Sequence, residues 1–181
     1  MGTRHLICIV KDNEYKLAQY GQWDGYPSGQ GIDILEFLNK EMDRDVFLKK
    51  LDLVKPYPEN DANNLIKELG RMPVYFSRDT GAKILPYIQN SEKEIPTFLN
   101  KDFVGDSLFC EWAWVIDFDK NTFEVYKGFN KEHVDPTERF ADVATVHEEY
   151  KQVRHFHTFD LNNLPDEDQF LAILEPEEDE D

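Results

Sequence analysis

The stretch from Ala18 to Gly31, AQYGQWDGYPSGQG, concentrates residues that could bind a ligand. It holds four of the chain's nine glycines and one of its three tryptophans. Free backbone amides at a glycine-rich helix start can bind an anion, and a nearby arginine can hold a carboxylate or phosphate with two hydrogen bonds. The sequence therefore predicts a ligand pocket formed by Thr3, Arg4, Gln22, Trp23, Asp24, Gly25, Tyr26, Gly29 and Gly31.

A structural explanation of the same residues stays open. The glycines could serve only to make the turns, and Arg4 and Asp24 could form a buried ion pair. The spacing matches neither the P-loop nor the dinucleotide-binding fingerprint, so the sequence predicts no cofactor. The expected ligand is an unidentified small molecule or protein.

Two further groups could do chemistry. His155 and His157 alternate along an expected strand and share a face, as metal ligands can. No further ligand follows at a diagnostic spacing, so we expect no metal site. Asp117 and Asp119 could hold a cation or act in acid–base catalysis, but their position is more typical of a hairpin turn. We expect no catalytic residue from these patterns.

The elements that position the candidate pocket are the first two strands. Thr3–Val10 is apolar on both faces, which predicts an interior place in a sheet. A turn follows, and Tyr15–Tyr20 returns antiparallel. This pairing brings Thr3 and Arg4 beside Gln22. The expected register sets these residues opposite one another: Val10 and Tyr15, Cys8 and Leu17, Arg4 and Gly21.

The rest of the chain predicts an α+β fold with a mostly antiparallel sheet of about five strands, packed with several helices. The strands form two hairpins and one further strand. We expect a single domain over residues 1–174 and an acidic tail over 175–181. The expected helices are Ile32–Met42, Val46–Val54, Asn60–Leu69, Asp79–Ile88 and Asp166–Leu174, with Ile95–Leu99 in the helical, loop-rich middle. The later strands are Leu108–Phe118, Thr122–Lys127 and Val153–Phe159.

The charge limits the partners. The net charge is −17, which disfavours direct nucleic-acid binding because phosphate contacts need a basic surface. The acidic residues could keep the protein soluble, dock on a basic partner or mimic DNA. No segment is apolar enough to span a membrane, and two cysteines far apart in sequence suit a reducing, cytoplasmic setting. A homodimer through Trp112 and Trp114 is a further hypothesis.

Several motifs resemble a scattered family of uncharacterised fungal, bacterial and phage proteins. These begin with a GTR strand, here Gly2-Thr3-Arg4, and carry a Q-aromatic-D-G-Y-P-x-G-x-G turn, here Gln22–Gly31. Ser77–Ala82 and Glu111–Asp119, followed by Phe123–Gly128, are similar to its later blocks. The resemblance covers roughly residues 1–130 and implies no known activity.

The opening hairpin is also loosely similar to N-terminal-nucleophile hydrolases. Gly2 stands where their nucleophile would be, so this likeness implies an inactive relative unless processing exposes Thr3. The favoured hypothesis is a non-enzymatic binding protein, one version being a phage or mobile-element protein that blocks a host factor. The alternative is a hydrolase or transferase that uses Thr3 as nucleophile or Asp24 as base. An intact mass that begins at Thr3 would favour the alternative.

Overall fold

The computed structural model describes residues 2–176. Met1 and residues 177–181, which include most of the expected acidic tail, lie outside the described residues. The strands are β1 (His5–Lys11), β2 (Glu14–Gly21), β3 (Val54–Pro56), β4 (Ile95–Thr97), β5 (Trp112–Asp117), β6 (Thr122–Lys127) and β7 (Arg154–Asp160). The helices are α1 (Ile32–Glu36), α2 (Arg44–Lys50), α3 (Glu59–Leu69), α4 (Ile84–Gln89) and α5 (Glu167–Leu174).

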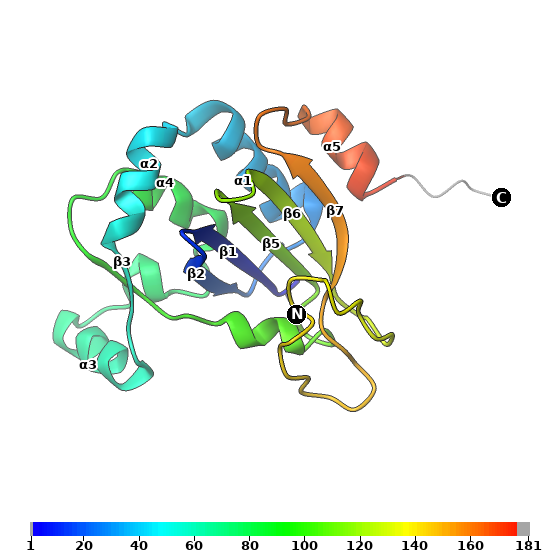
Figure 1. Cartoon of the computed structure of the whole chain (residues 1–181). Helices are drawn as coiled ribbons and strands as arrows, with labels where there is room; N and C mark the ends of the chain where they lie inside the picture. The colour runs from blue at the N-terminus through cyan, green and yellow to red at the C-terminus, as the bar shows by residue number, and fades with distance from the viewer. Residues whose placement is uncertain (1, 177–181) are drawn as a thin grey trace.

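The main sheet has five strands in the order β2-β1-β5-β6-β7 (Figure 1). β1 pairs in parallel with β5, and the other neighbours are antiparallel. β3 and β4 form a separate parallel pair. The expected α+β class with a mostly antiparallel sheet is confirmed. β1 is interior, in agreement with its two apolar faces.

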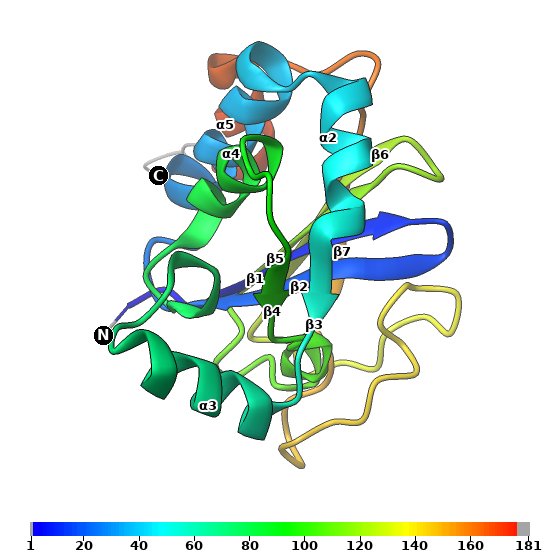
Figure 2. The same ribbon diagram turned by 90° about the vertical axis from the view of Figure 1, so that its left-hand side faces the viewer.

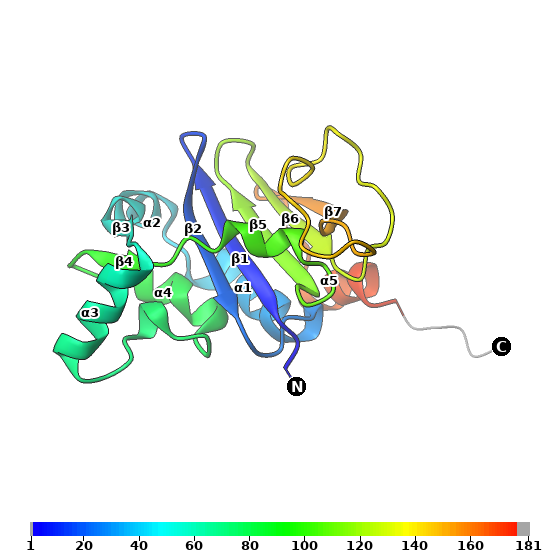
Figure 3. The same cartoon turned by 90° about the horizontal axis from the view of Figure 1, so that it is seen from below.

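The sheet has two differently covered faces, which Figure 2 shows from the side. On the helix face, Ile7 and Trp114 pack beneath α1, α2, α4 and α5, with Phe47 and Phe170 among the covering side chains. On the loop face, Cys8 packs beneath residues of the long connections between strands. Figure 3 shows the connection from β6 to β7 on the loop face. The chain between β1 and β5 thus supplies most helices of one layer.

The register of the first hairpin differs from the prediction by one residue over most of its length. Val10 lies opposite Tyr15 as expected, but the register shifts between Ile9 and Val10. Cys8 therefore faces Ala18, and His5, not Arg4, faces Gly21. A bulge adds one residue to one strand, and this irregularity has no distinct signal in the sequence.

The middle of the chain contains the largest error in the predicted elements. Ile95–Leu99, expected in a helical region, contains strand β4, which pairs with β3. The helix expected over Val46–Val54 ends at Lys50, and Val54 begins β3. Such short apolar runs suit a helix or a strand, and tertiary pairing decides between them.

Several boundaries follow local rules. Gly70 ends α3 with φ 65°, the left-handed conformation that favours glycine. Asp166 caps α5, and Gln169 completes a capping box. Trp112 and Trp114 are both buried, so neither forms the exposed aromatic patch suggested for a dimer. Among the helices of residues 2–176, none has the length and apolar character needed to cross a membrane.

Candidate functional site

Residues 21–31, here called the glycine turn, join three parts of the chain. The Gly25 amide donates to the Thr3 carbonyl over 2.9 Å, which fixes the turn to the N-terminal segment. The Trp114 indole Nε1 donates to the Gly25 carbonyl over 2.9 Å. Gln30 accepts a hydrogen bond from the Ala82 amide at 2.8 Å. The turn is thereby attached to β5 and to the segment before α4.

The glycines in this turn allow close packing. A Cβ atom on Gly21 would lie 2.1 Å from Nε2 of His5, and one on Gly31 would lie 2.7 Å from the ring of Trp114. No real Cβ atom occupies such positions without displacement of its neighbours. His5 is 1% exposed. Burial lowers the pKa of its imidazole to about 4, although the Trp23 backbone and the charge of Asp24 oppose this shift.

The remaining predicted pocket residues take separate partners. The guanidinium of Arg4 lies 5.2 Å from the centre of the Phe109 ring. Asp24 accepts a hydrogen bond from the Tyr26 hydroxyl over 3.1 Å. Arg4 and Asp24 form no ion pair within residues 2–176. The structure brings the two segments together as expected, but it does not form the buried Arg4–Asp24 ion pair that the structural alternative expected within residues 2–176.

Exposure also separates the members of the predicted pocket. Trp23 is 44% exposed, and its Nε1 donates to Asp79 over 2.6 Å. The side chain of Gln22 accepts a hydrogen bond from the Tyr20 hydroxyl. The backbone N–H of Gln22 donates to the backbone carbonyl of Arg78. None of the nine predicted residues lines either of the two cavities described below. The predicted pocket stays a prediction.

A buried charge cluster surrounds Arg139 on the loop face. Its guanidinium donates to Asp117 and to both carboxylate oxygens of Glu124, over 2.7 and 2.9 Å in the latter case. Tyr126 and Thr122 also donate to Glu124, over 2.6 and 2.7 Å. Sequence reasoning identified Asp117 but missed Glu124 and Arg139, because no local spacing links them.

The electrostatics of this cluster indicate a structural role. The Arg139 ion pair and three hydrogen-bond donors outweigh burial and hold the pKa of Glu124 at about 2. Burial and the neighbouring carboxylate raise the pKa of Tyr126. Asp117 also accepts from the Asp119 and Lys120 amides, and Asp119 accepts from the Asp12 and Asn13 amides. The two aspartates thus stabilise turns, which agrees with the structural alternative.

The two candidate metal-binding histidines lie on opposite faces of β7. A register shift pairs His155 with Tyr126 and His157 with Val125, so one extra residue separates them on the strand. His155 contacts Tyr126 on the loop face. The His157 ring lies on the helix face, with its centre 4.5 Å from the centre of the Phe159 ring. The expectation of a shared face is wrong. Within residues 2–176, no group of three or more His, Cys, Asp or Glu side chains is placed to hold a metal ion.

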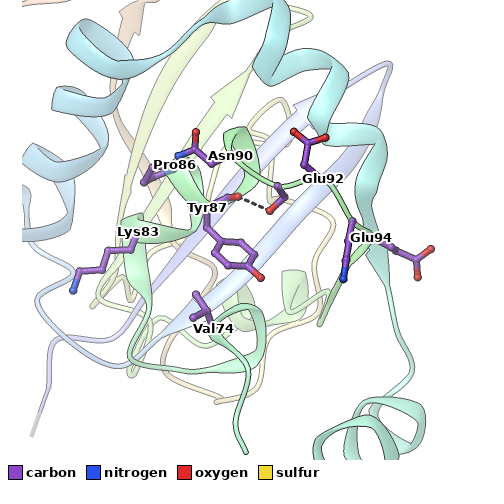
Figure 4. Close-up of a pocket in the computed structure, with 9 residues that line it drawn as sticks. Val74, Lys83, Pro86, Tyr87, Asn90, Glu92 and Glu94 are labelled. Atoms are coloured by element: carbon purple, nitrogen blue, oxygen red, sulfur yellow. Dashed lines mark hydrogen bonds between the residues drawn. The ribbon is translucent and has the colours of Figure 1, made fainter. Parts of the chain in front are cut away.

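The larger of two cavities of interest lies beside α4 and measures about 630 Å³ (Figure 4). The charged residues of its lining carry no net charge, because there are two lysines, Lys83 and Lys93, and two glutamates, Glu92 and Glu94. Ser91 donates its hydroxyl to the Tyr87 carbonyl over 2.6 Å. This hydrogen bond is the dashed line at Tyr87 in Figure 4. Its lining includes none of the unpartnered buried polar atoms, so the case for a specific ligand is weak.

A smaller cavity, here called the Gln19 pocket, lies at the outer edge of β2 and measures about 290 Å³. Gln19 is 7% exposed, and neither its Oε1 nor its Nε2 has a hydrogen-bond partner within residues 2–176. A buried amide without partners is costly and calls for an explanation. The lining residues are Gln19, Tyr20, Tyr75, Phe76, Ser77, Arg78, Phe98 and Asn100.

The pocket occupies a gap in the hydrogen bonding of the β2 edge. On one side the backbone N–H of Asn100 donates to the Ala18 carbonyl over 2.8 Å. On the other side the backbone N–H of Gln22 donates to the Arg78 carbonyl over 2.9 Å. The Tyr20 amide, between them, points outward and donates to Asn100 Oδ1 over 3.4 Å. Because the amide and carbonyl of one strand residue face the same edge, the Tyr20 carbonyl also faces outward here.

Sequence reasoning missed this pocket although it predicted the strand. Gln19 alternates with Leu17, which is fully buried on the helix face, and it lies opposite Ile7. A glutamine at a core-facing strand position was the available signal. The pocket walls come from residues 75–78 and 98–100, far away in sequence. Comparison of the chain with family models, curated proteins and solved structures gave no match.

Proposed function

We propose that this protein is a non-enzymatic binding protein that takes a small molecule in the Gln19 pocket. The observation that carries the proposal is the amide of Gln19, which is buried with a donor and an acceptor free. A bound ligand would satisfy both groups and offset the cost of their burial. This hypothesis keeps the predicted role of the first hairpin but moves the ligand from the glycine turn to the outer edge of β2.

The chemistry of the walls supports a ligand that is partly aromatic and partly polar. Phe76 and Phe98 lie with ring centres 4.8 Å apart, and Tyr75 meets Phe76 edge-on at 5.0 Å. Gln19, Asn100 and the Tyr20 backbone supply hydrogen-bonding groups on the β2 side. An apolar wall with a few placed polar groups is the usual make-up of a small-molecule site.

Thermal unfolding with a panel of small planar amides and heterocycles, such as nicotinamide, benzamide and adenine, tests the proposal. At least one compound should raise the Tm, since a ligand that binds only the folded state stabilises it. Gln19→Leu should abolish this increase. Gln89→Leu is the matched control, because Gln89 bonds to Asp43 and Glu41 instead of the pocket, and should retain it.

A panel without any stabilising compound, or an equal increase in Gln19→Leu, would contradict the proposal. The docking of the acidic surface on a basic partner, the cytoplasmic location and the phage setting stay predictions from sequence.

A further inference from the structure

The charge at the Gln19 pocket contrasts with that of the whole chain. The protein carries a net charge of −17, yet within the described range 2–176 no acidic residue lines this pocket. Among those residues, Arg78 is its one charged lining residue. It is exposed and forms no ion pair with any residue of the described range 2–176. A free guanidinium beside a pocket favours an anionic group on the ligand, above all a carboxylate or phosphate.

The interior of the pocket favours a flat ring with a polar edge. A glutamine amide offers one acceptor and one donor side by side, which match an adjacent donor and acceptor on a heterocycle, as in adenine. Tyr75, Phe76 and Phe98, which also line the pocket, are aromatic side chains of the kind that stack on such a ring. At about 290 Å³ the cavity admits a single ring system and leaves a charged substituent outside, near Arg78.

We propose that the Gln19 pocket binds a mononucleotide whose base presents an adjacent N–H donor and acceptor to Gln19 and whose phosphate lies beside Arg78. Adenine and nicotinamide both present such an edge, and the proposed ligand is the mononucleotide of one of these two bases. This inference rests on the proposed function and adds the class of ligand. Gln19 selects the base, Tyr75 and Phe98 supply the stacking surface, and Arg78 holds the phosphate.

Isothermal titration calorimetry of the full chain tests the inference, with AMP, nicotinamide mononucleotide, adenosine and inorganic phosphate as separate probes. One of the two mononucleotides should bind, and phosphate alone should bind at least tenfold more weakly. If AMP is the ligand, adenosine should bind about tenfold more weakly than AMP because it lacks the contact with Arg78. A preference for nicotinamide mononucleotide over AMP would identify the other base.

Three variants assign the contacts. Gln19→Leu should weaken the preferred mononucleotide at least tenfold, because the base then faces an apolar side chain where it needs two hydrogen bonds. Arg78→Gln should weaken the mononucleotide about tenfold and leave the matching nucleoside unchanged. Arg154→Gln, an exposed arginine on β7 at the opposite edge of the sheet, should change neither.

The outcomes separate this inference from the proposed function. If neither mononucleotide binds more tightly than phosphate, or if Arg78→Gln has no effect, the nucleotide assignment is wrong. An uncharged amide that stabilises the protein through Gln19 would then still support a small-molecule site. If no planar amide, heterocycle or nucleotide binds, both proposals fail.

Discussion

The Arg139 cluster and the Gln19 amide are both buried against the main sheet. They differ in how many of their polar atoms have hydrogen-bond partners. The cluster holds three charged side chains, and Glu124 accepts four hydrogen bonds from three donors. Gln19 carries no charge, and neither of its side-chain polar atoms has a partner among the described residues 2–176. The charged cluster looks more like an active site, yet its groups are occupied with one another. The neutral amide is the group left without hydrogen-bond partners within residues 2–176, and a ligand that supplied them would offset the cost of its burial.

The positions of the two regions explain this difference. Arg139 belongs to the long connection between β6 and β7 and fixes that connection to the loop face. Gln19 lies near the opposite edge, where residues 98–100 pair with β2 for only a short distance. A complete neighbouring strand would fill the gap that now forms the pocket. Satisfied polar groups thus stabilise the fold, whereas the incomplete edge leaves room for binding.

The largest expected effect is the loss of the charge cluster. Arg139→Met should lower the free energy of unfolding by about 3–5 kcal/mol, because it leaves Asp117 and Glu124 as uncompensated buried charges. Urea denaturation measures this change. Arg154→Met, which removes an exposed arginine, should change it by less than about 0.5 kcal/mol. Equal effects of the two variants would show that the cluster has no special structural role.

Acid should destabilise the protein in two separate pH ranges. The pKa of His5 is about 4 in the folded protein and about 6.5 in an unfolded chain, so the unfolded state binds more protons between these values. Stability is therefore complete above pH 6.5 and falls by up to about 3 kcal/mol as the pH drops to 4. Urea denaturation across this range should show the slope, and His5→Phe should remove it.

Glu124 acts in the lower range. Its pKa is about 2 in the folded protein and about 4.5 in an unfolded chain, so its contribution is complete above pH 4.5 and is lost as the pH falls through 2. Glu124→Gln should therefore show a shallower slope below pH 4.5 and keep the slope from 6.5 to 4. The reverse pattern would show that the two titrations are assigned to the wrong groups.

The smallest effect compares two glutamines. Gln89→Leu should lower the free energy of unfolding by about 1 kcal/mol, because it removes hydrogen bonds to the Asp43 amide and the Glu41 carbonyl. Gln19→Leu should leave it unchanged or raise it, because it removes an amide that has no partner in the free protein. Denaturant midpoints measure both. A loss of about 1 kcal/mol in Gln19→Leu would mean that the amide is already satisfied, and the argument for a ligand would fail.

Local sequence patterns predicted much of the fold. The two apolar faces of Thr3–Val10 placed β1 inside the sheet, and the hairpin turn expected at Asp117 and Asp119 located the β5–β6 hairpin, with β6 found at Thr122–Lys127. The candidate site was less accessible. The first hairpin was recognised as important, and the glycine turn does lie against Thr3, but the bulge at Ile9 shifted the pairing. The structural alternative for Arg4 and Asp24, a buried ion pair, is not formed within residues 2–176, and their predicted role in a pocket stays a prediction.

The sequence by itself determined the two apolar faces of β1, several turn residues and the helix ends at Gly70 and Asp166, because these depend on neighbours a few positions away. Tertiary structure alone decided that β5 runs parallel to β1, that Arg139 contacts Glu124, and that the Gln19 amide has no partner within residues 2–176. Each of these depends on segments brought together from distant parts of the chain. Whether a buried polar group is structural or available for binding depends on those distant partners, which a residue's own sequence context does not reveal.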